Sequence, residues 1–217
     1  MSGKKVYERL KAAGMSHAGA CAVLGNFEAE SALRANNLQN SYEKKLGFVD
    51  ELYTRAVDSG DYKNFAGDGA GYGLAQWTYG PRKKNLLEFA NSRGASIGDG
   101  DMQVDFAVQE LRTEYPGLWS FLCATDDMYA AAERVCKEFE RPAVNNIEAR
   151  YEYALKWDRE LGEPADKAWY PPDLSILILQ SVLVGNNYST DINGYKNAEF
   201  LKKLREFVQD MGGLEDA

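Results

Sequence analysis

Apolar residues recur every three or four positions along most of the chain, the spacing that places them on one face of a helix. Val6 and Leu10 share such a face, which ends at Gly14. Ser16 can cap the next helix, whose apolar residues also fall on one side: Ala20, Val23, Leu24 and Phe27. The pattern further predicts one or two short helices within 42–59, one that begins at Pro81, and others near 101–114, 117–124, 126–140 and 145–161.

A different pattern interrupts these helices between residues 66 and 79. Four glycines fall within the seven residues 67–73, a density that disfavours a helix. The stretch 74–79 then has a strand-like composition. We expect a small β-hairpin or a tight loop here, inside a domain that is otherwise mainly helical.

The domain organisation is indicated by prolines. Three of them fall within 162–173 and predict a linker or an ordered crossing loop. The linker separates a main domain at 1–161 from a short C-terminal segment at 174–217, which we expect to be helical. Hydrophobic residues make up 45% of the chain, enough for a core in the main domain.

The charge and the cysteine content of the chain restrict the classes of partner and the kinds of site that we expect. The net charge is −8 and there is no long run of Lys or Arg, which argues against nucleic acid or an anionic membrane as a partner. Apolar stretches such as Ile176–Leu179 are too short to insert into a membrane. Cys21, Cys123 and Cys136 form no CxxC pair, so we expect no metal site, no disulfide framework, and synthesis in the cytosol.

Glu30 is the strongest candidate for an acid catalyst. It lies three residues after Phe27 and seven after Val23, so it prolongs the buried face of its helix near the C-terminal end. Partial desolvation and the negative end of the helix both favour the protonated form of a carboxyl. The alternative is a solvated Glu, or one paired with an Arg. Glu28 points roughly 200° away and cannot share a cleft with Glu30.

A second candidate site is the segment 71–78, GYGLAQWT. Glycines such as Gly73 allow a ligand to approach the backbone closely. Gln76 can donate to and accept from a sugar amide or hydroxyl, while Tyr72 and Trp77 offer flat faces for pyranose rings. The alternative is a structural turn that leads into a core strand.

Together the two signals resemble the lysozyme superfamily, and more closely the phage-tail-type lysozyme domain of phage tail proteins and endolysins. The resemblance is carried by GNFEAES (25–31), NLQNSYEKKLGF (37–48), DYKNFAGDGAGYGLAQWTYGPRK (61–83), SIGDGDMQ (96–103) and FERPA (139–143). It implies a mainly α (α+β lysozyme-like) fold of two lobes, with a small β-hairpin at the cleft between them. It also implies Glu30 as the acid and the hairpin around 71–78 as the cleft wall.

The activity that the resemblance implies is hydrolysis of the β-1,4 bond between N-acetylmuramic acid and N-acetylglucosamine in bacterial peptidoglycan, without a cofactor. Two carboxylates roughly 6.5–9.5 Å apart hold a water in inverting glycosidases. Asp68, in the glycine-rich loop, is the first candidate for the second carboxylate; it is alternatively a turn-forming Asp. Glu140, which we place among the substrate contacts, is the second candidate.

Other functions stay open at this point. A lytic transglycosylase works with one Glu and yields a 1,6-anhydro product, and a wall-binding or tail-structural protein can keep a silent cleft. His17 and Cys21, four apart on a helix, indicate a rival Cys–His peptidase, although catalytic pairs usually come from separate elements.

The C-terminal segment and the cellular location complete the expectations. Leu179, Gln180, Leu183, Tyr188, Asn193, Gly194 and Phe207 resemble a short three-helix peptidoglycan-binding repeat, from which Asn193 and Val208 depart. The alternative is two helices that pack on the main domain. The first residues lack the apolar core of a signal peptide. We therefore expect synthesis in the bacterial cytoplasm, and action on the wall after release or within a phage particle beside tail components.

Overall fold

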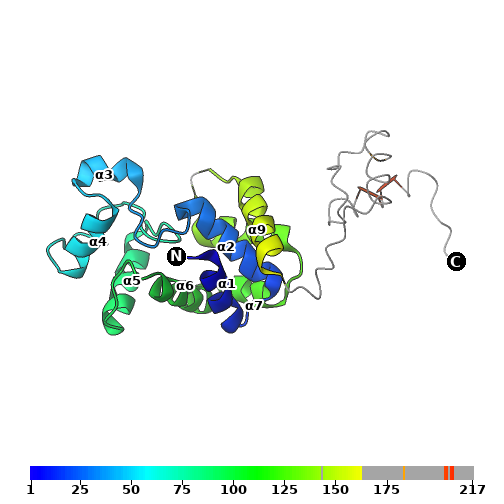
Figure 1. The fold of residues 1–217 in the computed structure, drawn as a ribbon, viewed down its shortest axis with the longest axis horizontal. Helices are drawn as coiled ribbons and strands as arrows, with labels where there is room; N and C mark the ends of the chain where they lie inside the picture. The colour runs from blue at the N-terminus through cyan, green and yellow to red at the C-terminus, as the bar shows by residue number, and fades with distance from the viewer. Residues whose placement is uncertain (143, 163–182, 184–202, 205, 208–217) are drawn as a thin grey trace. The chain divides into compact units, whose positions relative to one another are not determined.

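The computed structural model describes residues 1–142 and 144–162, together with 183, 203–204 and 206–207 (Figure 1). The chain divides into the units Met1–Gly162 and Glu163–Ala217. The fold and the site below belong to the first unit. Apart from those few positions, the linker expected at 162–173 and the segment expected at 174–217 lie outside the described residues.

The first unit is mainly helical, as the apolar spacing predicted. Its helices are α1 (Gly3–Ala12), α2 (His17–Ser31), α3 (Asn40–Leu46), α4 (Asp50–Asp58), α5 (Gly80–Ser92), α6 (Gly100–Glu114), α7 (Pro116–Ala124), α8 (Met128–Arg134), the π-helix η1 (Val135–Glu140) and α9 (Ile147–Leu161). Ser16 caps α2 by accepting from the Gly19 backbone N–H, and Pro81 lies in the first turn of α5. Every helix predicted within this unit is confirmed, but the one predicted over 126–140 is divided into α8 and η1. No helix of the described residues has the length and apolar character that crossing a membrane requires.

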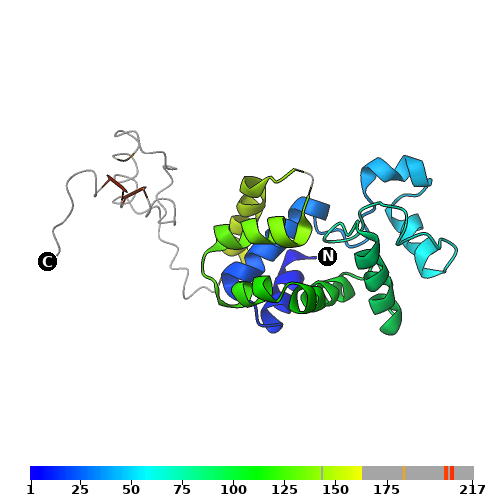
Figure 2. The same ribbon diagram turned by 180° about the vertical axis from the view of Figure 1, so that it is seen from behind.

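Helix α2 is the centre of the larger lobe and is buried on nearly every side. It lies beside α9 in both views (Figures 1 and 2). Gly25 permits the close approach, because a Cβ there would lie 2.6 Å from the Arg150 carbonyl oxygen. The glycine of the GNFEAES motif therefore brings Arg150 of α9 next to the end of α2.

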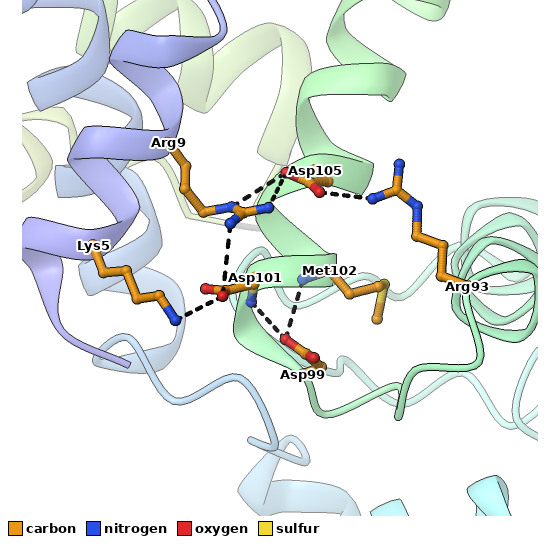
Figure 3. A network of polar contacts seen from close by, with 7 residues as sticks. All are labelled: Lys5, Arg9, Arg93, Asp99, Asp101, Met102 and Asp105. Carbon is orange, nitrogen blue, oxygen red and sulfur yellow. Dashed lines mark hydrogen bonds and ion pairs between the residues drawn. The ribbon is translucent and has the colours of Figure 1, made fainter.

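Salt bridges tie α1 to α6 beneath this lobe, as Figure 3 shows. Lys5 and Arg9 of α1 pair with Asp101 at 2.6 and 3.6 Å, and Arg9 also pairs with Asp105 at 2.7 Å. Arg93, after α5, reaches the other oxygen of Asp105 at 2.7 Å. These contacts fix α6, the helix that carries Glu110 and Glu114 to the site described below.

The smaller lobe holds α3 and α4, which lie together at the end of this unit away from α1, α2 and α9 (Figure 1). Its interior contains a buried polar group that we call the Asp68 cluster: Tyr53, Tyr62, Asp68 and Lys83. The Asp68 and Lys83 side chains are completely buried and pair at 2.6 Å. Tyr53 and Tyr62 donate to Oδ2 of Asp68, the Ala70 N–H donates to its Oδ1 at 2.9 Å, and Lys83 also donates to the Ala70 carbonyl. Asp68 thus uses both oxygens to hold the smaller lobe together.

The segment 66–79 is a tight loop rather than a developed hairpin. Tyr72 and Trp77 form one isolated antiparallel bridge, and Tyr72 also bridges to Leu38. The strand expected over 74–79 is absent, because the loop turns back at once: Gly73 has φ +78° and Gln76 has φ +45°. A Cβ at Gly73 would lie 2.6 Å from Oε1 of the buried Gln103, which accepts from the Leu74 N–H. Gln103 thereby connects SIGDGDMQ to the loop.

Candidate active site

An open cleft of about 1190 Å³ runs between the loop 69–81 with the start of α5 on one side and the ends of α2, α6 and η1 on the other. Its ionisable lining consists of Glu30, Arg82, Glu110, Glu114, Glu140 and Arg141. Its aromatic lining consists of Tyr42, Tyr79 and Tyr115. The shape suits an extended polymer that is contacted from both sides.

Glu30 lies in this cleft at the end of α2, where the sequence placed it. Ser31 fixes the helix end, because its Oγ lies 3.0 Å from the carbonyl oxygens of Phe27 and Leu74. Arg150 of α9 donates to Oε1 of Glu30 at 2.5 Å and to Asn26 Oδ1 at 3.0 Å. This ion pair with a buried guanidinium is the alternative considered from the sequence, a Glu paired with an Arg.

Glu140 is the second carboxyl of the cleft and differs from Glu30 in its surroundings. Both of its oxygens are buried, and no described group donates a hydrogen bond to them. Burial raises the pKa of Glu140 well above its ordinary value, and Glu30 raises this pKa further, while Arg82 and Arg150 oppose the shift. Glu140 ends η1, and π-helical turns are common at functional sites. The arrangement places a carboxyl without hydrogen-bond donors, Glu140, in the same cleft as one that is paired with Arg150, Glu30.

The floor of the cleft is a satisfied ion pair. Arg82 donates to both oxygens of Glu110, at 2.6 and 2.7 Å, and to the Phe139 carbonyl at 2.9 Å. Trp77 donates its indole N–H to the same carboxylate at 3.1 Å. Glu110 therefore orients the cleft wall and has little capacity left for a substrate.

Of the residues within 71–78 that the sequence placed at a sugar-binding site, only some line the cleft. Gln76 lines the cleft, although its Nε2 donates to the Asn37 and Gly73 carbonyls. Tyr72 and Trp77 are completely buried, with the Tyr72 hydroxyl bonded to Thr54, so neither face is open to a sugar. Gly73 lies behind the lining and serves the turn. For these three the observed positions support the alternative of a structural turn.

Asp68 also lies away from the cleft lining. The expected role requires an open carboxylate that can hold a water. The Asp68 side chain is instead buried, and it is bonded to Lys83 and to the Ala70 N–H. Its residue type suits a turn, and the Ala70 contact is such a turn bond. We therefore assign Asp68 a structural role and carry Glu140 forward as the second carboxyl.

Sequence reasoning missed the tyrosines that line the cleft, and Arg150. Tyr79, 68% exposed, precedes Pro81 at the start of α5, and Tyr42 and Tyr115 line the cleft beside it. A turn residue before a helix start is a signal that could have indicated Tyr79. Arg150 lies 120 residues from Glu30, and no local pattern could have paired them.

Glu28 faces away from Glu30, as the helix geometry predicted. It is bonded to Lys156 at 2.8 Å and to the Trp157 indole at 2.5 Å.

The structure gives no support to a Cys–His peptidase built on Cys21 and His17. Cys21 is completely buried, and His17 bonds Asp158 through Nε2 at 2.7 Å, so the thiol has no access to a substrate. Within the described residues, no three His, Cys, Asp or Glu side chains are grouped to hold a metal ion.

The chain was compared with models of known protein families and with curated proteins. The family model for phage tail lysozyme matches residues 2–161, which is the whole of the helical unit that builds the site. No curated protein matches the chain.

Proposed function

The chain belongs to the phage tail lysozyme family, whose members are glycosidase-like enzymes of the cell wall, and from that premise we propose that it cleaves the β-1,4 bond between N-acetylmuramic acid and N-acetylglucosamine in peptidoglycan. The observation that carries the proposal is the pair of carboxyls, Glu30 and Glu140, in one cleft with opposite surroundings. Environments that differ in this way can divide the roles of acid and base between two carboxyls.

The pair supplies both proton transfers of a hydrolysis. The pKa of Glu140 is raised, so this carboxyl carries the proton that the pair needs, while Glu30 is ion-paired with Arg150. The proposed reaction requires that this proton reaches Glu30 once a sugar is bound. Glu30 then protonates the glycosidic oxygen as its bond to the anomeric carbon breaks. A water adds to that carbon and gives its proton to Glu140, which restores the pair.

The lining residues hold the glycan strand. Tyr79, Tyr42 and Tyr115 line the cleft and are the proposed contacts for the pyranose rings, in the role that the sequence had suggested for Tyr72 and Trp77. The Gln76 side-chain carbonyl is suited to accept from an acetamido N–H, while its amide stays bonded within the loop.

The proposed place of action follows from the family. A tail lysozyme acts on the cell wall, either as part of a phage particle beside other tail components or after release from a lysed cell. The partner is peptidoglycan itself, and the proposed chemistry requires no metal or organic cofactor.

The test is the identity of the products. Purified peptidoglycan is digested with the full chain, and the released fragments are analysed by mass spectrometry. Fragments with a reducing N-acetylmuramic acid end support the proposal. A 1,6-anhydromuramyl end means that the chain is a lytic transglycosylase, and a reducing N-acetylglucosamine end means that it cuts the other glycosidic bond. Absence of all three, with Glu30→Gln as the matched blank, means a silent wall-binding protein.

A further inference from the structure

The charged side chains that line the cleft differ in whether a partner of opposite charge compensates them. Glu30 is compensated by Arg150, and Glu110 by Arg82, which is committed to that carboxylate through two hydrogen bonds. Glu114 and Glu140 add acidic groups to the same lining. Arg141 is the one cation of this lining that makes no ion pair with a described residue.

Arg141 is also held in an unusual backbone conformation. It has φ +51° and ψ +51°, the left-handed region that a side chain other than glycine occupies at a cost, and Pro142 follows it directly. Its backbone N–H donates to the Cys136 carbonyl at 2.8 Å and completes the end of η1. Strain of this kind at the edge of a cleft is a reason to look for a function.

The side chain is anchored by one nitrogen only. Nε of Arg141 donates to the Glu138 carbonyl at 2.8 Å, and the guanidinium lies 5.6 Å from the centre of the Tyr115 ring. No described group bonds Nη1 or Nη2. The anchored Nε therefore leaves two adjacent N–H groups at the exposed rim, in the fork geometry that matches a carboxylate.

We propose that Arg141 binds a carboxylate carried by the muramyl residues of the substrate, and so selects muramyl glycans over neutral ones. The inference rests on the proposed function and names the substrate class more closely. Two sources offer the same chemistry: the lactyl carboxylate of a peptide-free strand, and a carboxylate of the stem peptide. Glu114 makes no ion pair with a described residue, so it repels either anion, and the unpaired guanidinium at the rim offsets that repulsion.

The experiment measures binding by the full chain in the Glu30→Gln background, which prevents turnover. Three ligands are compared by calorimetry: a neutral N-acetylglucosamine oligosaccharide, a peptide-free glycan with free lactyl carboxylates, and a glycan with stem peptides. The test variant is Arg141→Gly, because glycine suits the left-handed conformation and removes the guanidinium, together with its aliphatic stem, without straining the backbone. Its Tm should be unchanged or higher. Arg55→Ala is the control, since Arg55 is exposed on α4 and pairs with Glu51.

We expect Arg141→Gly to raise the Kd of a carboxylate-bearing glycan about tenfold, the range for a charge-assisted bond at an exposed rim. The neutral oligosaccharide should bind within about twofold of the parent, and added salt should narrow the difference. A loss confined to the peptide-free glycan identifies the lactyl group, and a loss confined to the stem-bearing glycan identifies the peptide. Arg141→Lys should restore only part of the affinity.

Two results overturn the inference while the proposed function stands: equal weakening of all three ligands, which means that Arg141 only shapes the rim, or no weakening of any. A parent protein that binds none of the three ligands overturns the proposed function together with the inference.

Discussion

The molecule buries carboxyl groups beside cations in two regions, and the two differ in how well their polar atoms are satisfied. In the Asp68 cluster, Lys83, Tyr53, Tyr62 and the Ala70 N–H all donate to one carboxylate. In the cleft, both oxygens of Glu140 and Nε of Arg150 are buried without a described partner. Both regions remove polar groups from water, but only the first recovers the cost in hydrogen bonds for every group, because Glu140 in the cleft has none.

The difference indicates which region faces a substrate. Burial with complete bonding fixes one structure, and in the Asp68 cluster it holds α4, the loop and α5 together. Burial without bonding lowers stability, so its presence at a cleft indicates a group kept for chemistry. The first candidate from the sequence, Asp68, belongs to the fully bonded region, and the second, Glu140, lines the cleft where we propose that the reaction takes place.

The largest expected effect is the loss of activity in Glu30→Gln. The amide cannot donate a proton, so the rate of wall digestion should fall about 10²–10⁴-fold. The variant should unfold at nearly the parental denaturant concentration, because the amide oxygen still accepts from Arg150. The measurement is release of soluble fragments, with circular dichroism for the fold.

Glu28→Gln is the matched control. Its amide can still accept from the Trp157 indole, so activity should stay near parental. An equal loss of activity in both variants would remove the assignment of the catalytic face of α2.

The reverse outcome is expected in the Asp68 cluster. Asp68→Asn leaves the buried Lys83 without its counter-charge and should lower the free energy of unfolding by about 3–5 kcal/mol. Activity per folded molecule should be unchanged. Urea unfolding and turnover, measured on the same samples, test both statements. A folded Asp68→Asn protein without activity would return Asp68 to the mechanism.

Glu140→Gln should stabilise the protein in a pH-dependent manner. The raised pKa means that folded Glu140 keeps its proton above the pH at which the unfolded chain loses it. The stability that Glu140 contributes is therefore full below the unfolded pKa and is lost as the pH rises through the folded pKa. An amide avoids this loss, and the gain above neutral pH should be on the order of 1–3 kcal/mol, the cost of an unsatisfied buried group. Unfolding curves from pH 4 to 9 measure it, and parallel curves for the two proteins would contradict the environment assigned to Glu140. Digestion should be strongly impaired.

The smallest effect concerns the aromatic residues. Tyr79→Ala should change stability by less than about 0.5 kcal/mol, because the ring is exposed. It should weaken glycan binding several-fold, as roughly 0.5–1.5 kcal/mol of ring contact is lost.

Tyr72→Phe should do the opposite: it removes the bond to Thr54 and lowers stability by about 0.5–1.5 kcal/mol without affecting binding. Calorimetry of unfolding and binding separates the two, and a binding defect in Tyr72→Phe would argue for the sequence-based sugar contact.

The sequence alone determined the helical architecture and the placement of Glu30. Apolar spacing and end signals such as Ser16 and Pro81 act between residues three or four apart, so they are readable along one helix. The short motifs around Glu30 and Gln76 also carried the family, because glycine and serine are needed there for close contacts that few other residues permit. The matched family model confirms that assignment.

Tertiary structure alone decided which side chains face the cleft. Tyr72 and Trp77 have the composition of a sugar platform, but packing against Leu38 and Glu110, from distant segments, turns their faces inward. The division of roles between carboxyls likewise depends on Arg150 meeting Glu30 from 120 residues away, and on a π-helical turn that leaves Glu140 unbonded. The burial and the charge of a site depend on all the residues that surround it in space. Many of those residues are distant in the sequence, so the periodicity of apolar residues along the chain cannot identify them.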